Sequence, residues 1–317
     1  MTVPPDYTTI EMAEERQWKG TTGGGNFGQK SLFVMLKRIP VILLYPVLYL
    51  VVPFYFFLGR KATESVKYYY REIWKYSKVK TFWHSFLSEL TFGKVVLDKF
   101  AVLAGNTKQF DIRFNDEDLQ NFNTLLDQDK GIILAGSHIG NFELLGQTLS
   151  QDKKPISCII YGGESSNYQA HRDQSFGKQN VKLIPISNDM SHLFTIKDAL
   201  DKGEIVAILC DRHFGGRKIK KCEFLGKEAY FPTGIFIMAA QMGIPVVSTF
   251  IMKNRGTHYT GYLKQLHINE EEESISKKTD ELLKAYVSSI ETILHQYPHQ
   301  WFNFFPFWEK DKQLEIK

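Results

Sequence analysis

The sequence contains one long run without a charged side chain, and this run constrains the fold more than any other feature. Residues 39–58 read IPVILLYPVLYLVVPFYFFL. A helix of that length is about 30 Å long, which matches the hydrocarbon core of a bilayer. A long polar segment precedes the run, which argues against a cleavable signal peptide. The run predicts an N-terminal hydrophobic membrane-anchor helix that spans the bilayer or lies in its plane, and the alternative is a buried pair of core helices.

The following segment, residues 68–100, is rich in Tyr, Phe, Trp and Lys. This composition is typical of amphipathic helices at a membrane surface, where lysine side chains extend toward the headgroups. An aromatic core helix is equally compatible with it. We therefore expect three regions: an N-terminal polar segment (1–30), the anchor with its aromatic amphipathic helices (31–100), and a catalytic domain (101–317).

Beyond residue 105, short apolar runs alternate with segments of helical period. This alternation predicts an α/β fold with a mostly parallel central sheet flanked by helices. In such sheets ligands bind at the carboxyl ends of the strands. The expected strands are residues 131–136, 156–161, 181–186, 204–210 and 244–251, and the expected helices are 139–150, 167–178, 189–202, 233–243 and 274–296.

Composition and motifs exclude several classes of protein. Apolar residues make up 43% and charged residues 23% of the 317, which is ordinary for a globular chain. The net charge of +4 is too small to indicate a nucleic-acid partner. The three cysteines form no CxxC pair, so we expect neither a disulfide framework nor a metal site. The nucleotide-like glycine pattern Gly23-x-Gly25-x-x-Gly28 has no strand before it and predicts no cofactor site.

A histidine followed five residues later by glutamate occurs three times, at His84, His138 and His267, where about one pairing with an acidic residue is expected by chance. His84 lies in a helical stretch, where residues five apart point in different directions. His267 leads into an acidic run. Only His138 follows an apolar strand directly, and its partner at that spacing is Glu143.

We interpret His138 as a general base on a strand-to-helix turn. A neutral imidazole can take a proton from a hydroxyl or an amine, and a carboxylate behind it, here Glu143, fixes the tautomer. Backbone N–H groups near Gly140 and Asn141, or Arg212, are expected to stabilise an oxyanion. Small side chains at this turn are expected to leave room for a substrate. The alternative is a buried histidine bonded to a loop carbonyl.

A second polar cluster follows the expected strand 204–210. It begins with Asp211-Arg212-His213 and contains six cations between residues 212 and 227, Arg217 among them. Cations at the carboxyl end of a strand suit an anionic headgroup or an acidic carrier protein. For the lysines, the alternative is a solvated basic loop.

Several segments in order resemble one known family. They are SHIGNFELLG (137–146), DRxxxG (211–216), FLGKEAYFPTG (224–234), IPVV (244–247) and PxQW (298–301). Together they resemble the lipid A biosynthesis (lauroyl/myristoyl) acyltransferase branch of the lysophospholipid acyltransferase superfamily, from about residue 20 to residue 308. The His-x4-Glu motif is weak alone, but the ordered series is fairly specific.

This resemblance implies a function. A fatty acyl chain moves from a thioester on acyl carrier protein or CoA to a hydroxyl or amine of a lipid, such as a lipid A precursor. His138 is the implied base and Glu143 its partner, with no metal, cofactor or covalent acyl-enzyme. The implied location is the bacterial inner membrane with the catalytic domain facing the cytoplasm. The implied oxyanion or substrate contacts are Gly140, Asn141, Asp211, Arg212, Arg217, Pro232 and Gly234.

The sequence departs from the family at two places. A Tyr-Arg pair is replaced by Tyr161-Gly162, and a His-Arg-Arg-Phe ending is replaced by an aromatic stretch at 302–308. These changes resemble a variant branch from Bacteroidetes-type bacteria, in which amino-acid lipids or polyene-type lipids are conceivable acceptors. Two other functions stay open: hydrolysis of a thioester or lipid by the same pair, and a non-catalytic membrane protein that binds acyl carrier protein.

Overall fold

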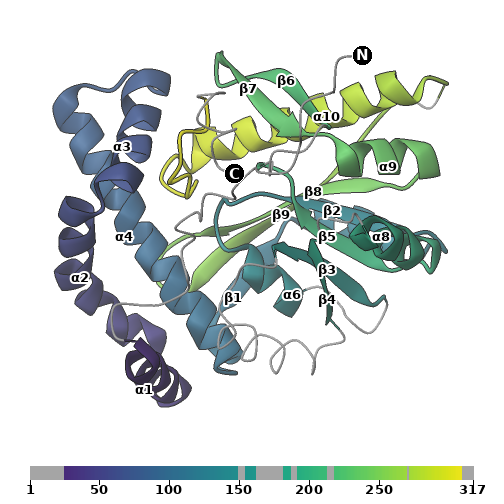
Figure 1. The fold of residues 1–317 in the computed structure, drawn as a ribbon. Coiled ribbons are helices and arrows are strands. Elements are labelled where there is room, and N and C mark those ends of the chain that lie inside the picture. Colours follow the sequence, from purple (N-terminus) through teal and green to yellow (C-terminus); the bar gives the residue numbers. More distant parts are fainter. Residues whose placement is uncertain are drawn as a thin grey trace, which may run out of the picture.

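The structure is a computed structural model that describes residues 25–148, 154–161, 181–186, 191–212, 218–269 and 271–308. Its first part is helical and lies along one side of the molecule (Figure 1). The longest of these helices, α4, begins at Ser77, whose hydroxyl caps the first turn. The helical elements are α1 (Gly25–Arg38), a 3₁₀ turn (Val41–Leu44), α2 (Tyr45–Leu58), α3 (Arg60–Tyr68), a π turn (Tyr69–Ile73) and α4 (Lys78–Leu103).

A seven-stranded sheet forms the centre of the part that follows these helices, in the order β1-β9-β8-β2-β5-β3-β4. All neighbouring pairs are parallel except β8 and β9, so the prediction of a mostly parallel α/β sheet is confirmed. The five expected strands are present, whereas β1 and β9 were not expected. The strands are β1 (Asp111–Phe114), β2 (Ile132–Gly136), β3 (Ile156–Tyr161), β4 (Val181–Ile186), β5 (Ile205–Leu209), β8 (Val246–Lys253) and β9 (His258–Leu266).

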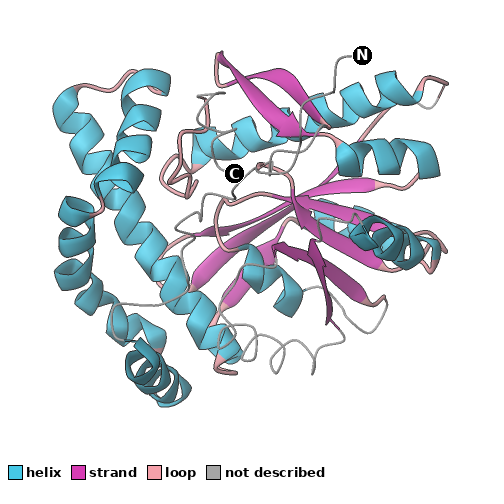
Figure 2. Cartoon of the chain, in the orientation of Figure 1, coloured by secondary structure: helices cyan, strands magenta, loops and turns pink. Residues whose placement is uncertain are grey.

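Helices cover both faces of this sheet (Figure 2). On one face lies α5 (Asp116–Leu126), and on the other lie α8 (Ser191–Asp201), α9 (Gly234–Met242) and α10 (Ile275–Gln296). Strand β2 is buried at all five positions because it is covered from both sides. A strand in that position has a continuous apolar sequence rather than an alternating one, as IILAG does.

Three of the five expected helices are confirmed as α8, α9 and α10, and the expected helix 167–178 lies outside the described residues. The expected helix 139–150 is wrong in its first part. A 3₁₀ turn (Phe142–Leu144) and one helical turn, α6 (Leu145–Thr148), stand in that place. The helix begins late because residues 138–141 are held in an irregular loop by pairing with other segments.

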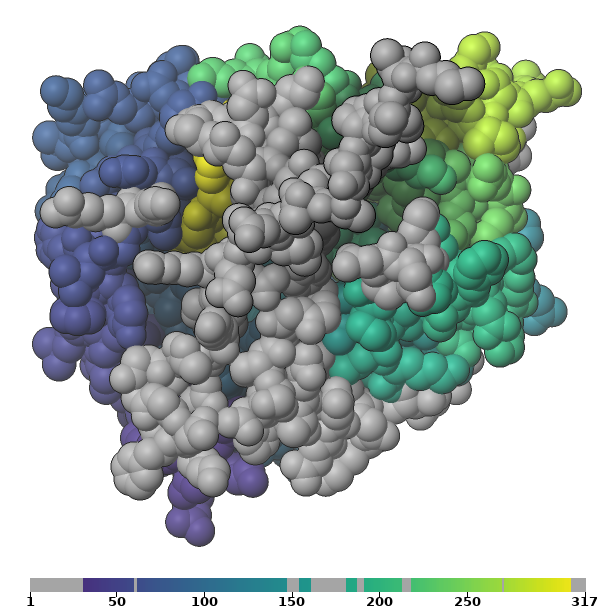
Figure 3. Space-filling view, in the orientation of Figure 1, coloured from purple at the N-terminus to yellow at the C-terminus, as the bar shows by residue number. Residues whose placement is uncertain are grey.

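The uncharged run is not one straight helix. Pro40 precedes the 3₁₀ turn, Pro46 starts α2 and Pro53 lies inside it. Within the described residues, Val41–Leu58 is the one stretch long and apolar enough to cross a membrane, with a mean hydropathy of 2.3. One third of it is buried inside the protein. In Figure 3 the purple and blue helices, which include this stretch, gather on one side of the molecule.

Candidate active site

The site is built at the carboxyl ends of two neighbouring parallel strands. Strands β2 and β5 pair with Gly136 opposite Leu209. His138 and Asp211 each follow two residues after that registered pair, so the two side chains emerge next to each other. The Nδ1 atom of His138 lies 2.8 Å from Oδ1 of Asp211. A carboxylate can only accept at this contact, so Nδ1 carries the proton and donates it.

Asp211 is buried and accepts further hydrogen bonds. Its Oδ2 accepts from the backbone N–H of His138 (3.0 Å) and from the indole N–H of Trp301 (3.3 Å). Burial by itself would raise the pKa of this carboxyl, but the His138 ring and the Arg212 guanidinium favour the charged form and lower the pKa to about 2. Asp211 is therefore a carboxylate at neutral pH, and it is held in place by the three hydrogen bonds that it accepts.

The His138 side chain keeps 26% of its surface exposed, whereas that of Asp211 keeps 2%. Burial of the ring is the largest influence on the His138 pKa and lowers it. Asp211 acts in the opposite direction, and Arg212 and Lys99 add to the lowering. The net shift is downward, so the ring is neutral at pH 7. With its proton on Nδ1, the ring keeps on Nε2 the lone pair that can accept a proton.

The C-terminal segment holds the His138 loop in place. The N–H of Phe302 donates to the carbonyl of His138 (3.0 Å), and the N–H of Gly140 donates to the carbonyl of Gln300 (2.8 Å). The N–H of Asn141 donates to the carbonyl of Ile251 (2.8 Å). Both N–H groups are thus already paired within the protein, and the predicted contact of Gly140 and Asn141 with an oxyanion stays a prediction.

Gly140 also does not provide space for a substrate, as the sequence had suggested. Its φ of +66° lies in the left-handed region, and a Cβ there would stand 2.2 Å from the carbonyl oxygen of Ile251. Glycine is needed because the loop passes directly against β8. The small residue therefore serves close packing and not substrate access.

Glu143 does not occupy the position at Nδ1 that the sequence assigned to it, since Asp211 is there. Glu143 lies in the 3₁₀ turn after the loop and forms an ion pair with Lys99 of α4, with Oε1 2.5 Å from Nζ. Lys99 in turn is one of the charges that lower the His138 pKa. Glu143 is thus connected electrostatically to the ring through Lys99, and its catalytic role stays a prediction.

Arg212 lies beside Asp211 and points toward the aromatic C-terminal stretch. Its Nη2 donates to the carbonyl of Phe302 (3.1 Å), and its guanidinium lies 4.7 Å from the centre of the Phe305 ring. Its role at the oxyanion or substrate stays a prediction. Arg217, the other arginine of this cluster, lies outside the described residues.

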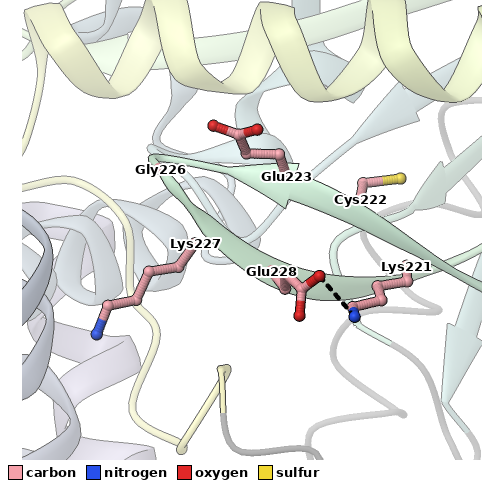
Figure 4. Close-up of a pocket in the computed structure, with 6 residues that line it drawn as sticks. All are labelled: Lys221, Cys222, Glu223, Gly226, Lys227 and Glu228. Atoms are coloured by element: carbon pink, nitrogen blue, oxygen red, sulfur yellow. Dashed lines mark ion pairs between the residues drawn. The ribbon is translucent and has the colours of Figure 1, made fainter.

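The lysines that follow do not form a loop at the strand end, as expected, but a separate hairpin of β6 (Ile219–Phe224) and β7 (Lys227–Pro232). Figure 4 shows a shallow hollow at this hairpin, in which Lys221 forms an ion pair with Glu228. Lys220 is paired with Asp280 of α10. Lys220 and Lys221 are thus paired with carboxylates, whereas Lys227 donates to the hydroxyl of Tyr68 (2.9 Å), and an anionic substrate site at these lysines stays a prediction.

Pro232 and Gly234 lie at the junction where β7 ends and α9 begins. Their predicted contact with substrate stays a prediction. Among the residues that the structure describes, no group of three or more His, Cys, Asp or Glu side chains could hold a metal ion.

From the sequence, Asp211 was expected to contact substrate. Its position as the hydrogen-bond partner of the His138 ring was not predicted. One signal was available. Both His138 and Asp211 follow closely on an apolar strand, and with the strand ends that the structure gives, Gly136 and Leu209, the spacing is two residues in each case. If these strands are adjacent, parallel and in register, equal spacing brings the two side chains together. The strand order that makes them adjacent was not readable from the sequence.

A partly exposed neutral histidine on a buried carboxylate, at the carboxyl edge of a parallel sheet, is the arrangement of an enzyme that uses acid–base catalysis. Residues 89–310 match the family model of bacterial lipid A biosynthesis acyltransferase. Because the match covers 222 of the 317 residues, the chain belongs to this family and is an acyltransferase. No curated protein matches the chain.

Proposed function

We propose that this acyltransferase moves a fatty acyl chain from an acyl thioester, carried by acyl carrier protein or CoA, to a hydroxyl or amine of a lipid acceptor such as a lipid A precursor. The observation that carries the proposal is the 2.8 Å contact between His138 Nδ1 and Asp211, which leaves Nε2 as a base. Membership in the lipid A acyltransferase family supports the substrate class.

In the proposed reaction, Nε2 of His138 removes the proton of the acceptor as its oxygen or nitrogen attacks the thioester carbonyl. A tetrahedral oxyanion forms and then collapses, which breaks the C–S bond. The imidazolium gives its proton to the departing thiolate. Asp211 stabilises the imidazolium between these two proton transfers and keeps the ring in one orientation. No oxidant, reductant or covalent acyl-enzyme is required.

The charges around the ring have different proposed roles. Arg212 remains the candidate for oxyanion stabilisation, since the backbone donors of Gly140 and Asn141 are occupied. Glu143 balances the charge of Lys99 and so limits how far Lys99 lowers the pKa of His138. In this proposal Glu143 acts on the base through Lys99 and without holding the ring itself.

The proposed location is the cytoplasmic face of the bacterial inner membrane. Membership in a bacterial family and the apolar stretch Val41–Leu58 support membrane association. A cytoplasmic catalytic domain follows from the proposed thioester donors, because acyl carrier protein and CoA are cytoplasmic carriers in bacteria.

The test is a transfer assay with the full chain in bilayer vesicles, a long-chain acyl thioester of acyl carrier protein or CoA, and extracted lipids of the source bacterium. The expected result is an acylated lipid that forms only when an acceptor is present. Mass spectrometry of lipids from a deletion strain identifies the acceptor as the acylated species that disappears. Release of free fatty acid alone, with or without an acceptor, would show a hydrolase and contradict the proposal.

A further inference from the structure

Helices α2 and α4 pack side by side in opposite directions. At one end the Tyr45 hydroxyl donates to Asp98 (2.6 Å), and at the other the Phe56 ring packs edge-on against Phe82 (5.4 Å between centroids). Midway, Leu48 of α2 lies directly over Gly93 of α4. The two helices are therefore packed against each other along most of the length of α2 (Figure 1).

Helix α4 is not built to cross a bilayer. The part that lies against α2 carries Glu89, Lys94 and Asp98. If α2 stood upright across the hydrocarbon core, these groups would lie at the same depth, and charged groups inside a bilayer are costly. The packing of α2 on α4 is therefore incompatible with a simple transmembrane orientation of the apolar run.

The side of α2 that faces away from α4 is an exposed apolar stripe. Leu50 is 80% exposed and Phe57 is 65% exposed. Val47, Leu50, Phe54 and Phe57 follow one another at three or four residues, and Leu58 is four residues after Phe54, so they lie along one face of the helix. This stripe, which we call the α2 apolar face, consists of Val47, Leu50, Phe54, Phe57 and Leu58, and Leu43 of the preceding 3₁₀ turn extends it.

Cations lie at one end of the α2 apolar face and on the α4 side of the helix. Lys37 and Arg38 end α1 just before the run and are exposed. On the α4 side, Lys94 lies over the Tyr49 ring (5.7 Å), and Lys67 lies over the Phe56 ring (5.4 Å). A helix that is apolar on one side and carries lysine and arginine at its end and on the other side complements the boundary between acyl chains and anionic headgroups.

We propose that α2 lies in the plane of an anionic lipid bilayer, with the α2 apolar face in the acyl-chain boundary and α4 above it, and that the chain enters the membrane from one side only. This inference deepens the proposed function, since it rests on a lipid acceptor. Lys99 of α4, the helix that packs on α2, forms an ion pair with Glu143 of the candidate site. The site thus lies close to the membrane surface, and a lipid acceptor reaches it from the plane of the bilayer.

The first test maps the two ends of the run with a membrane-impermeant thiol reagent. Arg38→Cys and Glu64→Cys bracket the run, and Gln120→Cys on α5 reports the side of the catalytic domain; all three positions are exposed. Peptide mass spectrometry locates the label, so the native cysteines can stay. In inside-out and right-side-out membrane vesicles, all three positions should react from the same side. Reaction of Arg38→Cys only from the side opposite to Gln120→Cys would establish a spanning helix and overturn the proposal.

The second test measures flotation of the purified full chain with vesicles. Leu50→Glu should weaken binding about tenfold or more, because it places a charge on the buried side of the interface. Leu119→Glu, at an exposed leucine of α5, is the matched control and should bind as the unchanged chain does. Lys37→Gln should weaken binding to phosphatidylglycerol vesicles about fivefold and leave binding to phosphatidylcholine unchanged.

Equal binding of Leu50→Glu and Leu119→Glu would contradict the proposed face, and the folded state of each variant is checked by circular dichroism. Neither experiment depends on transfer activity. A failure of the proposed function would therefore leave these results intact, and a failure of this inference would leave the transfer assay intact.

Discussion

Two buried aspartates in this protein have pKa values that are shifted in opposite directions. Asp211 follows β5, accepts from His138 and Trp301, and has a pKa lowered to about 2. Asp98 on α4 is fully buried and contacts Lys253 of β8 (2.5 Å) as well as the hydroxyls of Tyr45 and Tyr259. Its pKa is raised, because burial outweighs the stabilisation from Lys253 and the hydroxyls.

The difference separates the carboxylate to which we assign a role in catalysis from a structural one. Asp211 is attached to a ring that keeps part of its surface exposed, so a proton can be exchanged there. Asp98 has partners only inside the protein, where it joins α4 to the end of β8. A buried ion pair of this kind contributes little net stability, but removing one partner leaves a buried charge without compensation. Asp98 therefore holds α4 against β8, whereas Asp211 orients the His138 ring.

The largest effect is expected at the base itself. His138→Ala should lower the rate of transfer by up to about 10⁴-fold, equivalent to about 5 kcal/mol, because no side chain is then left to accept the proton of the acceptor. The chain offers a matched control in His258→Ala, which removes an exposed histidine that contacts Asp111 at 3.1 Å. The control should transfer normally. A His138→Ala variant with full activity would refute the mechanism.

A large effect on stability, but not on the chemistry, is expected at the second aspartate. Asp98→Ala should lower the free energy of unfolding by about 3 to 5 kcal/mol, since Lys253 stays buried without its counter-charge. The double variant Asp98→Asn with Lys253→Met should recover most of this loss. Chemical denaturation of the purified variants measures both. If the double variant were no more stable than the single one, the two side chains would not be coupled.

A smaller loss of rate, with a diagnostic pH dependence, is expected from Asp211→Asn. The amide keeps the shape but not the charge, so we expect about a 10²-fold loss in kcat/KM. The carboxylate raises the pKa of His138, and the base is active when deprotonated. Its removal should therefore shift the acid limb of the pH–rate profile to lower pH. A shift in the other direction would contradict the assigned pair.

The smallest effect is expected at Lys99. This ammonium lowers the pKa of His138, so Lys99→Met should shift the acid limb to higher pH. Lys94→Met, five residues earlier in α4, is the control and should leave the profile in place. In the unchanged enzyme the acid limb should lie below the usual histidine pKa of about 6.5, since the net shift is downward. An unchanged profile in Lys99→Met would remove Lys99 and Glu143 from the proposed mechanism.

The sequence predicted the α/β layers because their signals are local. An apolar run such as GIILAG and the 22-residue periodic segment of α10 each identify an element without knowledge of its neighbours. Strand β9 was missed because its burial alternates, with Tyr259 inside and its neighbours partly exposed, and this pattern is weaker than a continuous run. The hairpin β6–β7 was missed because its lysines suggested a loop.

The sequence by itself determined the candidate base, since only one of the three His-x4-Glu histidines follows an apolar strand. It also determined that an uncharged stretch of about 30 Å must be accommodated. The partner of the base was decided by tertiary structure. Asp211 reaches His138 only because β2 and β5 are parallel neighbours in register, and strand order depends on long-range pairing that no local pattern encodes. The packing of α2 against a charged helix was likewise decided by tertiary contacts between segments far apart in the sequence.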